Sequence, residues 1–191
     1  MAERIEAETV PARLLPEDGT LRDLRQAAPL GLLPADDRLS LIGLTRLKKN
    51  WDGAACVIGA DRTHWVQISA DEAVSFQSFL TPRLAATLAP DAEGADSESA
   101  ADTLSRPERL ATHLSSADIA GSKDAILGHL IGAEIAATRP YWLGQMVVVI
   151  GDGVLSRAYA ALLDQQGVPA EILSPGDCAE AGRAALQDAR G

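Results

Sequence analysis

The C-terminal part of the chain alternates between apolar runs and amphipathic segments. Met146–Ile150 contains four consecutive β-favouring residues and predicts a buried strand, which a glycine turn separates from a helix over 154–166. The segment "GVPAEIL" predicts another strand, and "DCAEAGRAALQDA" predicts a closing helix. This order favours two parallel strands joined by a right-handed crossover.

Three shorter apolar runs lie upstream, at Ala54–Ile58, His64–Ser69 and Ala73–Phe79. Their connections have the length of turns, and the second and third runs alternate apolar with polar residues, so they predict an antiparallel meander. The fold class is therefore α/β, with three antiparallel strands plus two parallel strands flanked by helices. By analogy, this is the order of a single ribonuclease H-like lobe, as in actin and sugar-kinase ATPases.

Helical spacing is clearest in "PADDRLSLIGLTRLKKN", whose acidic start and basic end agree with the helix dipole, and in "SKDAILGHLIGAEIAAT". A helix over this first segment is a candidate cover for a face of the lobe. In the second, Gly128 and Gly132 share one face, which favours close packing against a neighbouring element over a ligand contact. A short helix is also expected from Leu21 onward, after the turn "PEDG".

The expected domain organisation is an N-terminal arm with helices over residues 1–50 and the lobe over 51–191. Within the lobe, residues 89–102 are acidic, rich in small residues and free of aromatic residues, so they predict an exposed, flexible loop.

Charge and composition exclude some functions. The net charge of −10 argues against a nucleic-acid partner, although a local pocket for a small anion remains open. No apolar segment approaches the ~20 residues of a membrane span and the N-terminus has no apolar signal region, so we expect a cytoplasmic protein without a membrane partner. Two distant cysteines and three scattered histidines indicate no metal site, and Cys56 is expected in the core.

Three stretches carry a resemblance to a known family: "GAACVIGADRTHWVQISADEAVSFQSFLT", "LGHLIGAEIAA" and "VVVIGDGVLSRAYAALLDQQGVPAEIL", with "AEAGRAAL" closing. The chain resembles the C-terminal half of the 2-dehydro-3-deoxygalactonokinase family, in divergent form. This resemblance implies a carbohydrate kinase lineage that uses ATP and magnesium to phosphorylate a small sugar acid. Family members open with an aspartate-glycine-threonine strand and turn that holds phosphate and metal, and nothing similar precedes Pro11, so the N-terminal lobe is expected to be lacking.

The chain departs from the family pattern at two turns. The family's Pro-Gly-Thr-His-Ser-Lys-Trp turn corresponds to "GADRTHW", where Ala60 and Asp61 replace the Gly-Thr pair. A carboxylate there would repel phosphate, although Arg62, Thr63 and His64 are candidates to pair with Asp61 or with an anion. At the second turn, Thr-Gly-Glu becomes Thr81, Pro82 and Arg83.

The candidate cofactor-binding residues follow from these turns. By the resemblance, Gly151, Asp152 and Gly153 form a loop near adenine and ribose, with Asp152 able to accept from a ribose hydroxyl. The alternative is structural: the two glycines supply a tight exit from a strand and Asp152 caps the next helix. Glu134 is expected to border the same cleft, and Arg62 and Thr63 complete the set; no catalytic residue is assigned.

Three hypotheses for function stay open. The first is a kinase relative without autonomous activity, and the second is an active kinase completed by homodimerisation or by a separate N-terminal lobe. The third is a noncatalytic protein-interaction module that uses the face left by the absent lobe.

Overall fold

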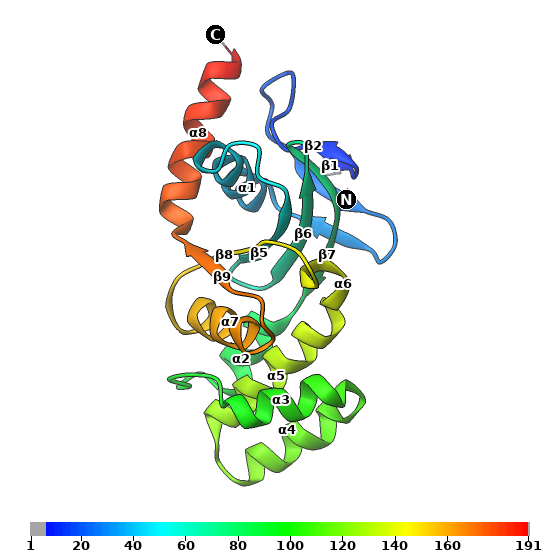
Figure 1. The fold of residues 1–191 in the computed structure, drawn as a ribbon, viewed down its shortest axis with the longest axis vertical. Helices are drawn as coiled ribbons and strands as arrows, with labels where there is room; N and C mark the ends of the chain where they lie inside the picture. Colours follow the sequence, from blue (N-terminus) through cyan, green and yellow to red (C-terminus); the bar gives the residue numbers. More distant parts are fainter. Residues whose placement is uncertain (1–6, 191) are drawn as a thin grey trace, which may run out of the picture.

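A six-stranded sheet forms the centre of the protein in a computed structural model that describes residues 7–190 (Figure 1). Its strand order is β2-β7-β6-β5-β8-β9, in which β5, β6 and β7 are antiparallel and β8 and β9 run parallel to β5. The principal strands are β5 (Gly53–Ile58), β6 (Thr63–Ser69), β7 (Glu72–Phe79), β8 (Val147–Ile150) and β9 (Ala170–Leu173). This topology confirms the expected meander and parallel pair.

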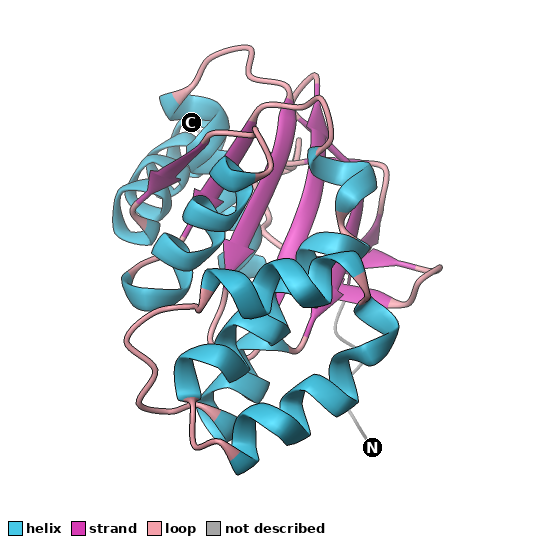
Figure 2. Cartoon of the chain, turned by 60° about the horizontal axis from the view of Figure 1, so that its bottom comes forward, coloured by secondary structure: helices cyan, strands magenta, loops and turns pink. Residues whose placement is uncertain are grey.

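Helices cover both faces of the sheet (Figure 2). Because side chains alternate along a strand, Val147 and Val149 of β8 enter one core cluster while Val148 and Ile150 enter another. The first cluster includes residues of α5 (Lys123–Ala137) and α7 (Gly153–Gln165); the second includes residues of α1 (Ala35–Leu47) and α8 (Pro175–Arg190). Cys56 is fully buried in the first cluster, as expected.

Helices α1 and α8 lie against each other, as Figure 1 shows on the upper left. A Cβ at Gly43 would stand 1.8 Å from the carbonyl oxygen of Cys178, and one at Gly182 would stand 2.2 Å from that of Leu39. These glycines let the two backbones approach. The predicted helix over α1 is confirmed, and it forms one layer of the lobe together with α8.

The N-terminal residues form strands where a helix was expected. The short strands β1 (Ala7–Thr9), β3 (Asp23–Gln26) and β4 (Gly31–Leu33) make a separate sheet, and β2 (Ala12–Arg13) adds to the edge of the main sheet beside β7. The helix predicted from Leu21 is wrong because the buried positions, Leu24 and Gln26, alternate as in a strand, and because β1 and β4 pair with both edges of β3.

Arg38 attaches this N-terminal sheet to α1. Its side chain is fully buried, and its guanidinium donates to the backbone carbonyls of Leu14, Arg13 and Arg22 at 2.7–2.9 Å. The same group forms an ion pair with Glu8 at 2.9 Å. Residues 7–34 are therefore joined to the lobe by polar contacts, although the division at residue 50 stays a prediction.

The acidic segment is shorter than predicted. Helix α2 (Thr81–Leu88) leads into it, but α3 (Ser97–Ser105) begins inside it, so the exposed loop expected over 89–102 is wrong for residues 97–102. Asp96 starts this helix by accepting a hydrogen bond from the Ser99 amide at 2.8 Å. A helical hairpin follows, with the short helix η1 (Pro107–Arg109) and α4 (Leu110–Ile119) before α5, and α6 (Arg139–Trp142) after it.

Gly128 and Gly132 allow α3 to pack closely on α5. A Cβ at Gly128 would lie 2.4 Å from the Asp96 carbonyl oxygen, and one at Gly132 would lie 2.3 Å from the Ala100 carbonyl oxygen. The predicted close approach at these glycines is confirmed, and its partner is the backbone of α3 and of the residue before it.

Candidate functional site

Two cavities flank the turn between β5 and β6, residues 59–62, which we call the β5–β6 turn. The hairpin cavity, about 1130 Å³, lies between this turn, the N-terminal sheet, the start of α1 and the end of β7. The sheet-end cavity, about 540 Å³, lies between the turn, α2 and the loop after β8. Gly59 and Ala60 line both cavities, so the turn separates two spaces of the size that small ligands occupy.

One wall of the hairpin cavity carries Asp37, His64 and Ser78, each from a different element. His64 Nδ1 lies 2.7 Å from Ser78 Oγ, and His64 Nε2 lies 3.4 Å from Asp37 Oδ2. The imidazole is almost completely buried, whereas the Asp37 side chain keeps 20% of its exposure. The three groups therefore form a polar series along the wall of the cavity.

Burial shifts the pKa values of this series in opposite directions. Desolvation, followed by repulsion from Asp36, raises the pKa of Asp37 to about 6. Desolvation, followed by the charge of Arg62, lowers the pKa of His64 to about 4. At neutral pH the imidazole is therefore uncharged and the Asp37 carboxylate is ionised but close to its pKa, a combination that is enriched at functional sites.

The same cavity presents cationic side chains. Arg25 of β3 and Arg62 of the β5–β6 turn both line it, and no described residue forms an ion pair with either guanidinium. Planar guanidinium groups bind carboxylates in a bidentate manner. The hairpin cavity therefore presents two guanidinium groups beside the carboxylates of Asp37 and Asp61, in spite of the strongly acidic composition of the chain.

Asp61 does not pair with its neighbours in the turn. Its Oδ2 lies 2.7 Å from Nη2 of Arg83, in the first turn of α2, and both side chains are about half exposed. The guanidinium lowers the pKa of Asp61. The pairing with Asp61 that was expected of Arg62, Thr63 or His64 is therefore made by Arg83, in an ion pair that joins the two turns at which the chain departs from the family pattern. The alternative, that Arg62, Thr63 or His64 pairs with an anion, stays a prediction.

A buried carboxyl group lies beneath these turns. Glu134 of α5 is 2% exposed; its Oε1 accepts from Thr63 Oγ1 at 2.5 Å and from Trp65 Nε1 at 2.8 Å, and its Oε2 contacts Thr81 Oγ1. Burial raises the pKa of Glu134, and the hydrogen bonds from the two threonines and Trp65 oppose that rise. The fully buried hydroxyl of Tyr159 also interacts electrostatically with this carboxyl without meeting hydrogen-bond geometry.

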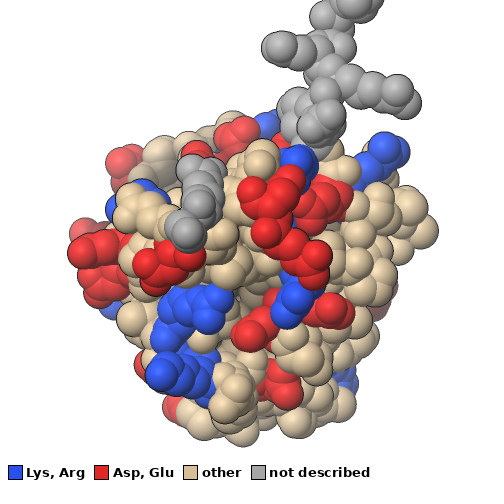
Figure 3. Space-filling model, turned by 90° about the horizontal axis from the view of Figure 1, so that it is seen from above, with Lys and Arg blue, Asp and Glu red and all other residues tan. Residues whose placement is uncertain are grey.

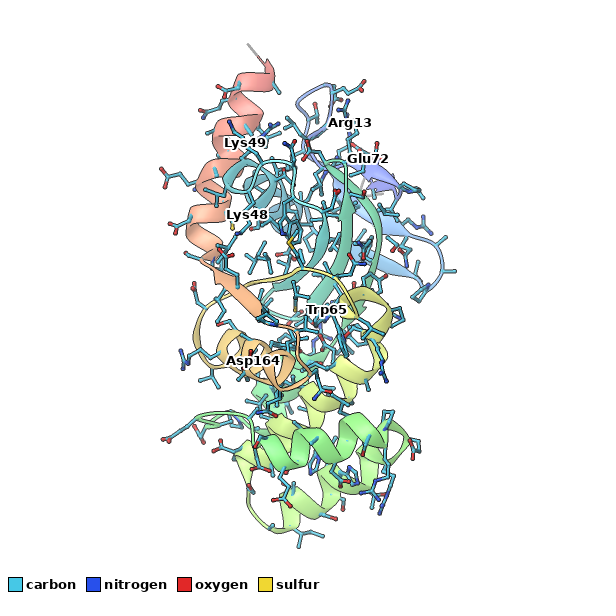
Figure 4. All side chains as sticks on the ribbon, in the orientation of Figure 1. Arg13, Lys48, Lys49, Trp65, Glu72 and Asp164 are labelled. Carbon is cyan, nitrogen blue, oxygen red and sulfur yellow. The ribbon has the colours of Figure 1, made fainter. Side chains whose placement is uncertain are left out.

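This cluster fixes the start of β6 and the start of α2 to the same side chain. Figure 4 shows Trp65 in the interior of the molecule. Neither Glu134 nor Thr63 lines either cavity, so the structure places both predicted site residues behind the β5–β6 turn, where they support it.

The glycine turn after β8 borders the sheet-end cavity. Gly153 has a φ of +78°, which favours glycine, and a Cβ at Gly151 would crowd the Ile58 side chain at 3.0 Å. Both glycines thus have structural reasons to be there. Asp152 lines the cavity and stands at the helix N-cap without making a side-chain capping bond, so its carboxylate stays available to a ligand.

Sequence reasoning named Arg62 and His64 on the wall of the hairpin cavity and Asp152 on the wall of the sheet-end cavity, but it missed the Asp37–His64–Ser78 series. The sequence indicates Asp37 only as a favourable charge at a helix start. The signal was weak because the three residues are separated in sequence: strand register pairs His64 with Ser78, and the packing of α1 brings Asp37 to them.

The described residues offer magnesium no protein cage. Among residues 7–190, no group of three or more His, Cys, Asp or Glu side chains is arranged to hold a metal ion. None of the described helices is long and apolar enough to span a membrane.

Acidic and basic side chains are interspersed on the end of the molecule seen in Figure 3.

Comparisons with known proteins agree with this architecture. Residues 93–186 match the model of the 2-keto-3-deoxy-galactonokinase family, which confirms the resemblance over that part of the chain. A candidate 2-dehydro-3-deoxygalactonokinase protein from Sinorhizobium meliloti superposes with a TM-score of 0.82 at 20% identity, covering 95% of this chain and 73% of its own.

A more distant structure shares the fold. Component A of (R)-2-hydroxyglutaryl-CoA dehydratase from Acidaminococcus fermentans has a TM-score of 0.53 at 14% identity, covering 82% of this chain and 69% of that one. A search of the curated proteins found none that matches the sequence. The α/β fold is thus that of sugar kinases and actin-like ATPases.

Proposed function

From the 2-keto-3-deoxy-galactonokinase domain over residues 93–186, we propose that this chain is a sugar-acid-binding and nucleotide-binding lobe of a cytoplasmic carbohydrate kinase. We further propose that the 191 residues by themselves bind both ligands without transferring phosphate. The sugar acid occupies the hairpin cavity, and ATP places its base and ribose in the sheet-end cavity.

The observation that carries the proposal is the position of the β5–β6 turn between the two cavities. Phosphoryl transfer requires the acceptor and the nucleotide to meet in line at one point, and Gly59 and Ala60 line both spaces. The charges agree with this assignment. Arg25 and Arg62 can bind a carboxylate in the hairpin cavity. Asp152, whose side chain makes no capping bond, can accept from a ribose hydroxyl in the sheet-end cavity.

The absence of transfer is proposed because a carboxylate occupies the turn where phosphate would pass. Asp61 replaces a small residue there and is itself paired with Arg83. Catalysis of phosphoryl transfer depends on positioning and on neutralisation of charge, and Asp61 takes up the charge of Arg83 that would otherwise help to neutralise the transferred group. The S. meliloti structure also extends beyond the part that this chain matches.

The test combines binding with turnover. Calorimetry with ATP and with 2-dehydro-3-deoxy-D-galactonate should give saturable binding of each, while a coupled ADP-release assay with both ligands and magnesium should not exceed the control without sugar acid. Turnover above that control would overturn the second part of the proposal, and light scattering would then show whether a homodimer completes the site. Binding of neither ligand would overturn the first part.

A matched pair of variants tests the assignment of the nucleotide. Asp152→Asn should weaken ATP binding several-fold and leave sugar-acid binding unchanged, because it removes a charged acceptor from the sheet-end cavity. Asp164→Asn, an exposed position near the other end of α7 (Figure 4), should change neither affinity.

A further inference from the structure

The polar series on the wall of the hairpin cavity both begins and ends at the cavity. Ser78 and Asp37 line it, and the buried His64 ring bridges them through its two nitrogens at 2.7 and 3.4 Å. Only Asp37 Oδ2 faces the imidazole. Among the described residues no side chain or amide donates to Asp37 Oδ1, so this oxygen is left for a ligand.

The protonation of the series follows from its geometry. Because the pKa of His64 is lowered to about 4, the neutral ring carries one proton at neutral pH. With that proton on Nε2, Nδ1 accepts from the Ser78 hydroxyl, and the N–H at Nε2 lies beside the Asp37 carboxylate, with 3.4 Å between Nε2 and Oδ2. The ring is held by its hydrogen bond to Ser78, and it stands against one oxygen of the Asp37 carboxylate.

We propose that Asp37 recognises a hydroxyl group of the acid bound in the hairpin cavity, accepting its hydrogen bond at Oδ1, and that Ser78 and His64 are positioning residues for this carboxylate. The inference rests on the proposed function, because it takes the sugar acid to occupy this cavity. It deepens that function by assigning the two ends of the ligand: the carboxylate meets Arg25 and Arg62, and a hydroxyl meets Asp37.

The charges of Arg25, Arg62 and Asp37 on the wall of the cavity make this recognition selective. The other titratable groups near Asp37 are Asp36 of α1, which does not line the cavity, His64 of β6, which is uncharged at neutral pH, and Asp61 of the β5–β6 turn, which is paired with Arg83. A simple carboxylate gains from the arginines but is repelled by Asp37, whereas a hydroxylated acid offsets that repulsion with a charge-assisted hydrogen bond. Asp37 therefore favours polyhydroxy acids over acids without hydroxyl groups.

The test compares two ligands on the full chain. Dissociation constants for 2-dehydro-3-deoxy-D-galactonate and for pyruvate, a 2-oxo acid without hydroxyl groups, are measured by calorimetry or ligand-observed NMR. In Asp37→Asn the preference for the sugar acid should fall roughly tenfold, since a neutral acceptor replaces a charged one. Pyruvate should bind the variant as well as or better than the parent, because a negative charge has been removed.

Two variants separate positioning from charge. Ser78→Ala should reduce the preference for the sugar acid by a smaller factor and leave pyruvate unaffected. Asp36→Asn removes the same charge from an exposed neighbour that does not line the cavity, and it should keep the preference. An unfolding curve for each variant shows that it is folded.

The outcomes distinguish the two proposals. Binding of the sugar acid with an unchanged preference in Asp37→Asn overturns the role of Asp37 and leaves the proposed function standing. An equal loss of both ligands in Asp37→Asn also overturns it, because a general defect in the cavity would be the cause. If the parent chain binds no sugar acid, the proposed function fails and the inference fails with it.

Discussion

Arg83 Nη2 lies 2.7 Å from Asp61 Oδ2, an ion pair between the β5–β6 turn and the start of α2. Both residues stand where the chain departs from the kinase family that it resembles, and the two departures contact each other. An unpaired carboxylate or an unpaired guanidinium at either position would alter the charge that a phosphate meets. In the ion pair these two opposite charges offset each other, so Arg62 is the cation that the β5–β6 turn presents to a ligand.

Removing the Asp61 carboxylate should make the β5–β6 turn bind anions more strongly. In Asp61→Asn, Arg83 loses its partner and joins Arg62 near the turn, so ATP should bind several-fold more tightly, with an affinity that falls more steeply as salt is added. Calorimetry at two ionic strengths measures both effects. The double variant Asp61→Asn with Arg83→Gln is the control and should return to the parent affinity. An unchanged affinity in the single variant would mean that phosphate does not approach this turn.

The buried carboxyl of Glu134 should contribute strongly to the free energy of unfolding. Glu134→Ala leaves Thr63, Thr81 and Trp65 Nε1 without their acceptor inside the core, so the free energy of unfolding should fall by about 3 kcal/mol or more. Glu134→Gln keeps an acceptor oxygen of the same shape and should change it by only ~1 kcal/mol. Urea unfolding of the two variants gives the comparison. Equal losses in both would show that charge, and not hydrogen bonding, holds the cluster together.

The sequence predicted the sheet better than the site. Long apolar runs such as Val147–Ile150 leave little choice of structure, because four consecutive β-favouring residues have to be buried on both faces. The N-terminal sheet was not predicted because its strands are short and because its tertiary contacts are distant in sequence: Leu24 and Leu33 pack into the second core cluster, and Arg38 contacts partners 16–30 residues away.

The same limit applies to the candidate site. Glu134 was expected beside the nucleotide because it follows an apolar stripe, but its helix faces the sheet so closely that the carboxyl meets Thr63 and Trp65 instead. Pairing of β6 with β7 and the placement of α1 bring Ser78, His64 and Asp37 together. No spacing along the sequence indicates that these three residues lie together, so only the tertiary structure shows it.

Asp37 should lower the free energy of unfolding at neutral pH while it contributes to binding of the sugar acid. Its folded-state pKa of about 6 lies above the ordinary aspartate pKa of 3.8, so the protonated form is favoured in the folded state. Its favourable contribution to stability is therefore present below about pH 3.8 and is lost as the pH rises through about 6. Above that, the buried charge destabilises the protein, and Asp37→Asn should raise the free energy of unfolding by about 2 kcal/mol near pH 7.5.

Urea unfolding of the parent and Asp37→Asn at a series of pH values measures this effect. The difference between the two proteins should be large at neutral pH and should shrink toward zero as the pH falls below about 4, where the parent carboxyl is protonated in both states. A difference that does not change with pH would show that packing, and not ionisation, separates them. A gain in stability combined with a loss of sugar-acid selectivity is the pattern expected of a binding residue.

The close contact between α3 and α5 should tolerate no side chain at Gly132. A Cβ there would lie 2.3 Å from the Ala100 carbonyl oxygen, and because that atom belongs to the backbone, a whole helix has to move. Gly132→Ala should therefore lower the free energy of unfolding by about 1–3 kcal/mol, in spite of the better helix propensity of alanine. Gly94→Ala, in the acidic loop with no atom within 4 Å of the added Cβ, is the control and should be close to neutral. If Gly132→Ala were as stable as the control, α3 would not be packed on α5, and the acidic segment would be the exposed loop that its composition predicts.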